Sequence, residues 1–189
     1  QYLLDPRYSK LAAYFANAKN LFKCPSDIFV SAAQRRAGYT ERVRSISGNI
    51  RVGDDSNAWD TAAFPRYTAK TSGLNNPGPS QTWIYMDEHP DSINDVGNFT
   101  YEPGGNGWVD VPATYHNGAG GIAFADGHSE IHKWTGGLAA APPVIRPAGS
   151  GSLGAIRAYC RADADALWWS LRTQRKSNIT EQWIRSKFR

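Results

Sequence analysis

Hydrophobic positions alternate with polar ones over several short stretches of this chain, and the alternation predicts strands. Residues 82–86 combine aromatic and β-branched side chains, and residues 98–101 do so more briefly. Residues 121–125 and 128–134 flank Asp126-Gly127, a dipeptide that favours a two-residue type I′ hairpin. In that register Ala125 lies opposite His128, and Ile122 lies opposite Ile131. We expect further strands at residues 21–24 and within residues 43–52.

Helical spacing is confined to the two ends of the chain. Asp5-Pro6 is a capping residue followed by Pro at the first helical position, and apolar residues then continue at helical spacing to Ala18. Residues 163–176 begin with acids and end with bases, which suits the helix dipole. Asn178 and Glu181 resemble a capping box before a short last helix. Residues 163–189 are therefore expected to form a C-terminal helical segment.

Length and composition indicate one domain with a packed core. The chain has 189 residues, of which 41% are hydrophobic. Stretches rich in Gly, Pro, Asn and Ser predict loops over residues 54–79, and an Ala/Pro/Gly-rich stretch predicts another over 138–154. No apolar run reaches the roughly 18–20 residues of a membrane helix.

The charge is distributed unevenly along the chain. The net charge is +4, but residues 81–132 contain eight acids, no Lys or Arg and all four histidines, so the remainder carries +12. Aromatic residues in the basic C-terminal third fall at helical spacing, which favours packing over nucleic-acid binding. An acidic centre and a basic remainder are complementary between copies, which favours self-association.

Two groups of side chains in the acidic window are candidate cation ligands. A loop after the strand at 82–86 concentrates carboxylates that suit Ca²⁺, namely Asp87, Glu88, Asp91 and Asp95. The alternative is a polar turn that caps its own backbone. His128, Glu130 and His132 share one strand face and could bind Zn²⁺ together with His116 or Asp87. The alternative there is an ordinary solvated strand face.

The two cysteines leave two alternatives open. Cys24 and Cys160 could form a disulfide in an oxidising compartment, or they could be two separate buried thiols. They are not spaced as a metal knuckle.

Common catalytic motifs are missing from the sequence. The chain has no Gly-x-Ser-x-Gly elbow, no His-Glu-x-x-His pair and no phosphate-binding glycine loop, so we do not expect an enzyme. Two other functions remain as alternatives. One is an extracellular carbohydrate-binding or adhesive module that uses Trp59, Trp83 or Trp108. The other is a zinc-dependent hydrolase built on His116, His128, Glu130 and His132.

One motif resembles a known family. His116 is followed by nine residues and then by Asp126-Gly127. This spacing resembles the signature of the bacterial prepilin-type H-x9-D-G family, which is related to type II secretion pseudopilins. Further stretches that resemble the family are Phe22-Lys23-Cys24-Pro25-Ser26-Asp27, Arg42-Val43-Arg44-Ser45, residues 87–95, residues 125–134, and Asp165 with Trp168, Arg172 and Thr173.

The resemblance implies an α+β pilin-like head: a mainly antiparallel twisted sheet with a helix packed on one face and long irregular loops. It implies a non-catalytic subunit of an extracytoplasmic pseudopilus or surface filament in a Gram-negative-type bacterium, whose partners are other pilin subunits and the secretion machinery. Such proteins have a leader and an apolar N-terminal helix, their only membrane contact. The chain starts at Gln1 without them, so we expect it to be a piece of a longer protein.

Related pseudopilins hold Ca²⁺ in a loop of the head, which favours a cation in the acidic window. We therefore expect the loop geometry to be set, with or without Ca²⁺, by Asp87, Glu88, Asp91, Asp95, His116 and Asp126.

Overall fold

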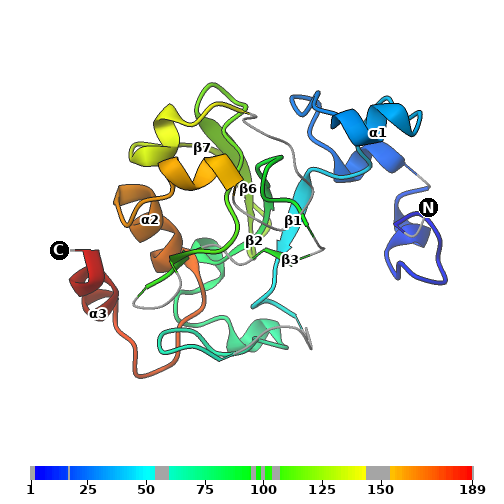
Figure 1. The fold of residues 1–189 in the computed structure, drawn as a ribbon. Coiled ribbons are helices and arrows are strands. Elements are labelled where there is room, and N and C mark those ends of the chain that lie inside the picture. The colour runs from blue at the N-terminus through cyan, green and yellow to red at the C-terminus, as the bar shows by residue number, and fades with distance from the viewer. Residues whose placement is uncertain are drawn as a thin grey trace.

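The computed structural model has an α+β architecture built on a mainly antiparallel sheet (Figure 1). It describes residues 3–16, 18–53, 60–94, 97–98, 101–103, 107–143 and 154–188. The sheet has the strand order β3-β1-β2-β6-β7, in which β1, β2, β6 and β7 pair antiparallel and the short β3 pairs parallel with β1. Its strands are β1 (Ile46–Asn49), β2 (Trp83–Asp87), β3 (Gly97–Asn98), β6 (Ala119–Phe124) and β7 (Ser129–Lys133).

A two-stranded sheet and short helices complete the described fold. The second sheet pairs β4 (Tyr101–Glu102) with β5 (Gly107–Trp108). The α-helices are α1 (Ala32–Arg36), α2 (Ala164–Arg172) and α3 (Glu181–Arg185). The 3₁₀ helices are η1 (Ala12–Tyr14), η2 (Lys19–Phe22), η3 (Thr71–Gly73), η4 (Pro79–Gln81), η5 (Gly137–Ala140), η6 (Gly154–Tyr159) and η7 (Ser186–Phe188).

The predicted hairpin is present, but its register differs by one residue from the prediction. Ile122 lies opposite Glu130, and Ala123 lies opposite Ser129. The reason is the turn: residues 125–127 form a three-residue loop in which Gly127 alone has a positive φ, 96°. A three-residue loop with glycine in the left-handed region is the next most common hairpin connection after the two-residue turns.

One face of the sheet is covered by α2 through tryptophan packing. Trp83 of β2 meets Trp169 of α2 with ring centroids 4.7 Å apart, and Trp134 meets Trp169 at 6.0 Å. All three rings are almost fully buried. The expectation of a helix packed on one sheet face is therefore confirmed, and α2 lies within the predicted range 163–176.

Two carboxylates at the start of α2 bind the loop that follows β7. Asp165, which is 1% exposed, accepts hydrogen bonds from the backbone N–H groups of Thr135, Gly136 and Leu138 at 2.8, 3.0 and 3.2 Å. Asp163 caps the helix and accepts from Gly137 at 2.6 Å. A Cβ on Gly136 would come within 2.4 Å of the Asp163 carboxyl group, so this close approach requires glycine.

The opposite face of the sheet is more open. Tyr85 of β2 and Ile131 of β7 are 47% and 61% exposed there. They line a shallow groove of about 310 Å³ together with Ile46, Gly121 and Ala123. The α2-covered face and this groove face are thus chemically distinct, one closed by tryptophans and one presenting small and apolar side chains to solvent.

The N-terminal elements differ from the predictions. Residues 5–16 form turns and the 3₁₀ helix η1 rather than a long helix, and Leu11 and Tyr14 are exposed, while position 17 lies outside the described residues. Residues 21–24 are not a strand, because η2 occupies their first half. An apolar stripe makes a stable helix only when the whole stripe packs against a partner surface. Here Ala12 is buried and Phe15 packs on Phe22 with ring centroids 5.1 Å apart, but Leu11 and Tyr14 face solvent, so the stripe is not buried as one face.

The C-terminal segment is helical as predicted, but α2 ends at Arg172 rather than at Lys176, and the cap of α3 differs from the prediction. The α3 N-cap is Thr180, whose hydroxyl accepts from the Trp183 N–H at 3.1 Å, so Asn178 is not the capping residue. Of the loop predicted at 138–154, residues 144–153 lie outside the described ones, and its start is taken by η5 and its end by η6. No helix in the described part of the chain is long and apolar enough to cross a membrane.

We predict that Asp165→Ala lowers the free energy of unfolding by about 2–4 kcal/mol, because it removes the acceptor of three backbone N–H groups. Denaturant unfolding measures this loss. The control is Glu181→Ala, which removes only an exposed i,i+4 ion pair with Arg185 and should cost less than about 0.5 kcal/mol. Equal losses for the two variants would contradict the assigned role of Asp165.

Candidate functional site

Three side chains from distant parts of the sequence meet beside the groove face of the sheet. The Nε2 atom of His116 lies 3.3 Å from the Cys24 sulfur and 3.2 Å from Oδ2 of Asp87. The three candidate ligand atoms all lie within 4.8 Å of one another. Asp87 is buried, whereas Cys24 and His116 are part-exposed. We call these three residues the Cys–Asp–His cluster.

Asp87 is positioned by the register of the sheet. It is the last residue of β2 and lies opposite Ile46 of β1, so its side chain projects to the groove face. Its Oδ2 accepts the Gly121 N–H at 2.9 Å. A Cβ on Gly121 would lie 2.7 Å from Oδ2, so glycine is required for this approach. Burial raises the pKa of the Asp87 carboxyl group, and the Gly121 N–H and His116 partly oppose that rise.

His116 is positioned by a tight turn that leads into β6. Asn117 and Gly118 have φ values of 56° and 73°, and the His116 N–H bonds the Ala119 carbonyl at 3.2 Å. Two consecutive residues with positive φ at Asn-Gly are typical of a type I′ turn. This turn places the His116 ring beside the end of β2, with Ser26 Oγ 3.5 Å from its Nδ1.

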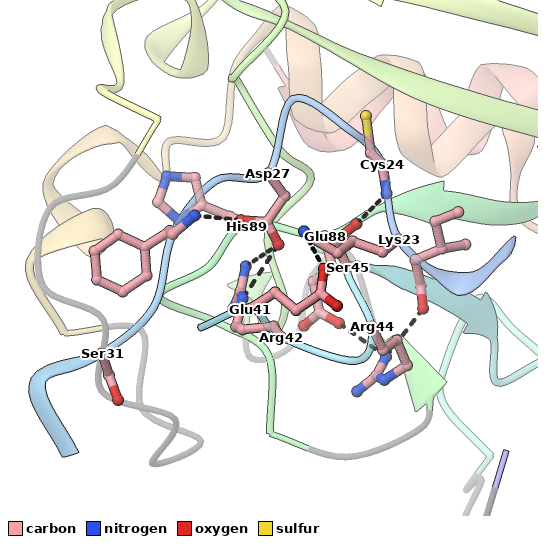
Figure 2. A network of polar contacts seen from close by, with 12 residues as sticks. Lys23, Cys24, Asp27, Ser31, Glu41, Arg42, Arg44, Ser45, Glu88 and His89 are labelled. Carbon is pink, nitrogen blue, oxygen red and sulfur yellow. Dashed lines mark hydrogen bonds and ion pairs between the residues drawn. The ribbon is translucent and has the colours of Figure 1, made fainter. Parts of the chain in front are cut away.

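Cys24 is held by a β-turn and by the hydroxyl group of Ser45. Pro25 follows Cys24 in a turn closed by the Asp27 N–H and the Cys24 carbonyl at 3.0 Å, as the sequence predicted for this Pro-Ser-Asp stretch. The Cys24 N–H donates to Ser45 Oγ at 2.7 Å. Figure 2 shows this contact and the buried Arg42–Asp27 ion pair, at 2.5 Å, that anchors the other end of the turn.

The geometry of the cluster does not match a cysteine-protease-type triad. In such a triad the acid binds one imidazole nitrogen and the nucleophile the other. Here Cys24 and Asp87 both approach Nε2 of His116, so Asp87 cannot orient the ring while that nitrogen takes the thiol proton. Convergence of a sulfur, a nitrogen and an oxygen on one point is instead the arrangement of ligands around a metal ion.

The carboxylates of the acidic window do not converge on one cation site in the described residues. Glu88 is fully buried and accepts hydrogen bonds from the hydroxyl groups of Ser47 and Ser92. Burial raises its pKa to about 8. Asp91 lies 3.4 Å from the buried ring of His89. The structure therefore separates Asp87, Glu88 and Asp91, because neighbouring residues on a strand point to opposite faces. Asp95 lies outside the described residues.

The predicted zinc ligands on β7 also do not converge. His128 stacks on Phe124 with centroids 4.3 Å apart and bonds Asp126 at 2.6 Å. His132 stacks on Trp168 at 3.9 Å, where burial lowers its pKa. Glu130 lies 3.5 Å from His132 only. The rings are used for aromatic packing, and the described residues contain one group of three or more close metal-ligating side chains, the Cys–Asp–His cluster.

The residues assigned to the two alternatives, an adhesive module and a zinc hydrolase, are not placed as those functions require. Trp83 and Trp108 are 1% and 5% exposed, so they cannot form a sugar-stacking platform, and Trp59 lies outside the described residues. His116 is in the Cys–Asp–His cluster, whereas His128, Glu130 and His132 are not, so these four do not form one centre.

The two cysteines are separate thiols, and the disulfide alternative is not realised. Cys24 contacts His116, whereas the Cys160 thiol lies 3.4 Å from the Ile156 carbonyl. The involvement of Cys24 in a polar cluster was missed at the sequence level. It is 92 residues from His116, and only the fold brings the two together.

Comparisons with protein-family models, with curated proteins and with solved structures gave no match. The class of protein that the structure defines is therefore an α+β domain with a mainly antiparallel sheet and the Cys–Asp–His cluster at the end of the central strand β2.

We predict that Cys160 reacts slowly with iodoacetamide in the folded protein. Burial raises the pKa of its thiol to about 12, and the thiolate is the reactive form. In a Cys24→Ser variant at pH 8, alkylation of Cys160 should be at least about 100-fold slower in buffer than in denaturant. Mass spectrometry of the unreduced wild-type chain should also find two free thiols. Detection of the two free thiols only after reduction would contradict the structure.

Proposed function

We propose that this chain is a non-catalytic structural subunit, the pilin-like head of a pseudopilus or related extracytoplasmic filament that assembles with copies of itself. The observation that supports the proposal most directly is the groove face of the sheet. One face is covered by α2, while the other leaves Tyr85 and Ile131 exposed, at 47% and 61%, around a shallow apolar groove. An open apolar patch bordered by polar residues is typical of a protein–protein contact.

The charge pattern supports the same proposal. The acidic window at 81–132 includes β2, β6 and all of β7 except Lys133, and its Asp87 and Glu130 line the groove, whereas the rest of the chain carries +12. Copies that bring the basic part of one chain to the acidic part of the next gain electrostatic complementarity, and this accelerates their encounter. An interface of this kind is weakened by salt.

Sedimentation velocity over a range of concentrations tests the proposal. We expect the chain to self-associate at low ionic strength and Ile131→Glu to weaken the association by placing a charge on the groove face. Ile28→Glu is the control, because Ile28 is 88% exposed and does not line the groove. A monomer at all concentrations, or an equal effect of both variants, would count against assembly through this face.

The reading frame before Gln1 provides an independent test. The filament assignment expects an apolar helix there, preceded by a Gly-Phe-type leader cleavage site. A natural frame that encodes neither would remove the filament assignment and leave the self-association result intact.

A further inference from the structure

We propose that Cys24, Asp87 and His116 form a binding site for one divalent transition-metal ion, best suited to Zn²⁺, with a fourth coordination position open to solvent. The cluster adjoins the groove, which Asp87 also lines, but metal binding does not require assembly and assembly does not require the metal, so either proposal can hold without the other. Three protein ligands with one open position are the usual count for a non-structural zinc centre.

The distances between the ligand atoms fit a tetrahedral ion. Zinc lies about 2.0–2.2 Å from nitrogen and oxygen ligands and about 2.3 Å from sulfur, so tetrahedral ligands are separated by roughly 3.3–3.6 Å. The observed His116–Asp87 and His116–Cys24 distances are 3.2 and 3.3 Å. The third distance lies within the 4.8 Å that encloses all three atoms. A small movement of the part-exposed Cys24 side chain would complete the geometry.

Hydrogen bonding alone leaves this cluster poorly satisfied. A neutral imidazole offers either one N–H or one lone pair at Nε2, and both the Cys24 sulfur and the Asp87 carboxylate approach that atom. If Nε2 of the neutral ring donates to Asp87, the Cys24 thiol finds no acceptor at that nitrogen. If Nε2 accepts from the thiol, its lone pair side faces the Asp87 carboxylate with no proton between them. A cation at the centre is attracted by all three groups at once. Binding would release the Cys24 thiol proton to the buffer.

Each of the three ligand residues is held in place by a further contact. The backbone at Cys24 is held by Ser45, Asp87 accepts the Gly121 N–H, and Nδ1 of His116 faces Ser26 Oγ at 3.5 Å. Contacts that orient a ligand from behind raise metal affinity by about 10–100-fold. Mixed sulfur, nitrogen and oxygen ligands select Zn²⁺ or Co²⁺ over Ca²⁺, which takes six to eight oxygens.

Titration of the reduced, chelator-treated chain with Co²⁺ and then Zn²⁺ tests the proposal. We expect one equivalent of Co²⁺ to produce a thiolate-to-cobalt charge-transfer band, one equivalent of Zn²⁺ to abolish it, and Ca²⁺ in excess to leave it unchanged. Cys24→Ser should lose the band. His116→Ala should weaken Co²⁺ binding by more than about 100-fold, which is the largest effect expected from removing a residue that only orients a ligand. Circular dichroism checks that each variant is folded.

Matched controls carry the same changes elsewhere in the chain. Cys160→Ser and His128→Ala should leave Co²⁺ affinity within twofold of the wild type, because neither residue is in the cluster. The proposal is overturned if the wild type gives no charge-transfer band, if Cys24→Ser keeps it, if Ca²⁺ displaces Co²⁺, or if the controls lose as much affinity as the cluster variants. Asp87→Asn should weaken binding; if that variant is unfolded, Cys24→Ser and His116→Ala decide.

Discussion

A carboxylate that is buried on folding needs hydrogen-bond donors in place of its hydration shell, and several buried carboxylates impose this constraint on the interior of this protein. The buried acids are Asp27, Asp87, Glu88, Asp91, Asp110 and Asp165. Asp165 meets the requirement most completely, because three backbone N–H groups of the loop after β7 point at it. These hydrogen bonds hold α2 over the sheet, and the tryptophan contacts between the helix and the strands depend on this placement. The hydrogen bonds of Asp165 and the packing of the tryptophans therefore support the same position of α2.

The same requirement is met differently along β2. Glu88 accepts hydrogen bonds from two serine hydroxyl groups. Its raised pKa favours the protonated form, so little negative charge is buried there. Asp87, on the opposite face, has one backbone N–H and an imidazole nitrogen that it shares with a thiol. Asp87, the last residue of β2, and Glu88, which follows it, therefore have different hydrogen-bond environments. Glu88 completes a buried hydrogen-bond network, while Asp87 lies in the part-exposed Cys–Asp–His cluster with the Tyr115 side chain also close to it.

The sequence predicted the elements whose signal is local, namely the strands near 82–86 and 121–134, the helix at 163–176 and the turn after Cys24. It failed where two local signals compete or where the signal is distant. Asp126-Gly127 predicted a two-residue type I′ turn, yet the hairpin closes through a three-residue loop and its register moves by one residue. The apolar stripe before Ala18 predicted a helix, but Leu11 and Tyr14 are exposed, so the stripe is not buried as one helix face. Cys24 joined Asp87 and His116 through tertiary pairing alone, which residue spacing does not encode.

The position of the Cys–Asp–His cluster relates it to the N-terminal segment. Cys24 belongs to a stretch with short 3₁₀ helices and several exposed apolar side chains, such as Leu21 and Ile28. That stretch is attached to the sheet region by polar contacts that include the Ser45 hydroxyl, the Arg42–Asp27 pair and the cluster itself. A metal ion bound at the cluster would replace a weak thiol–imidazole contact by coordinate bonds. Metal binding would then stabilise the docking of the N-terminal segment more than it stabilises the sheet, because the sheet is already held by its ladder and by α2.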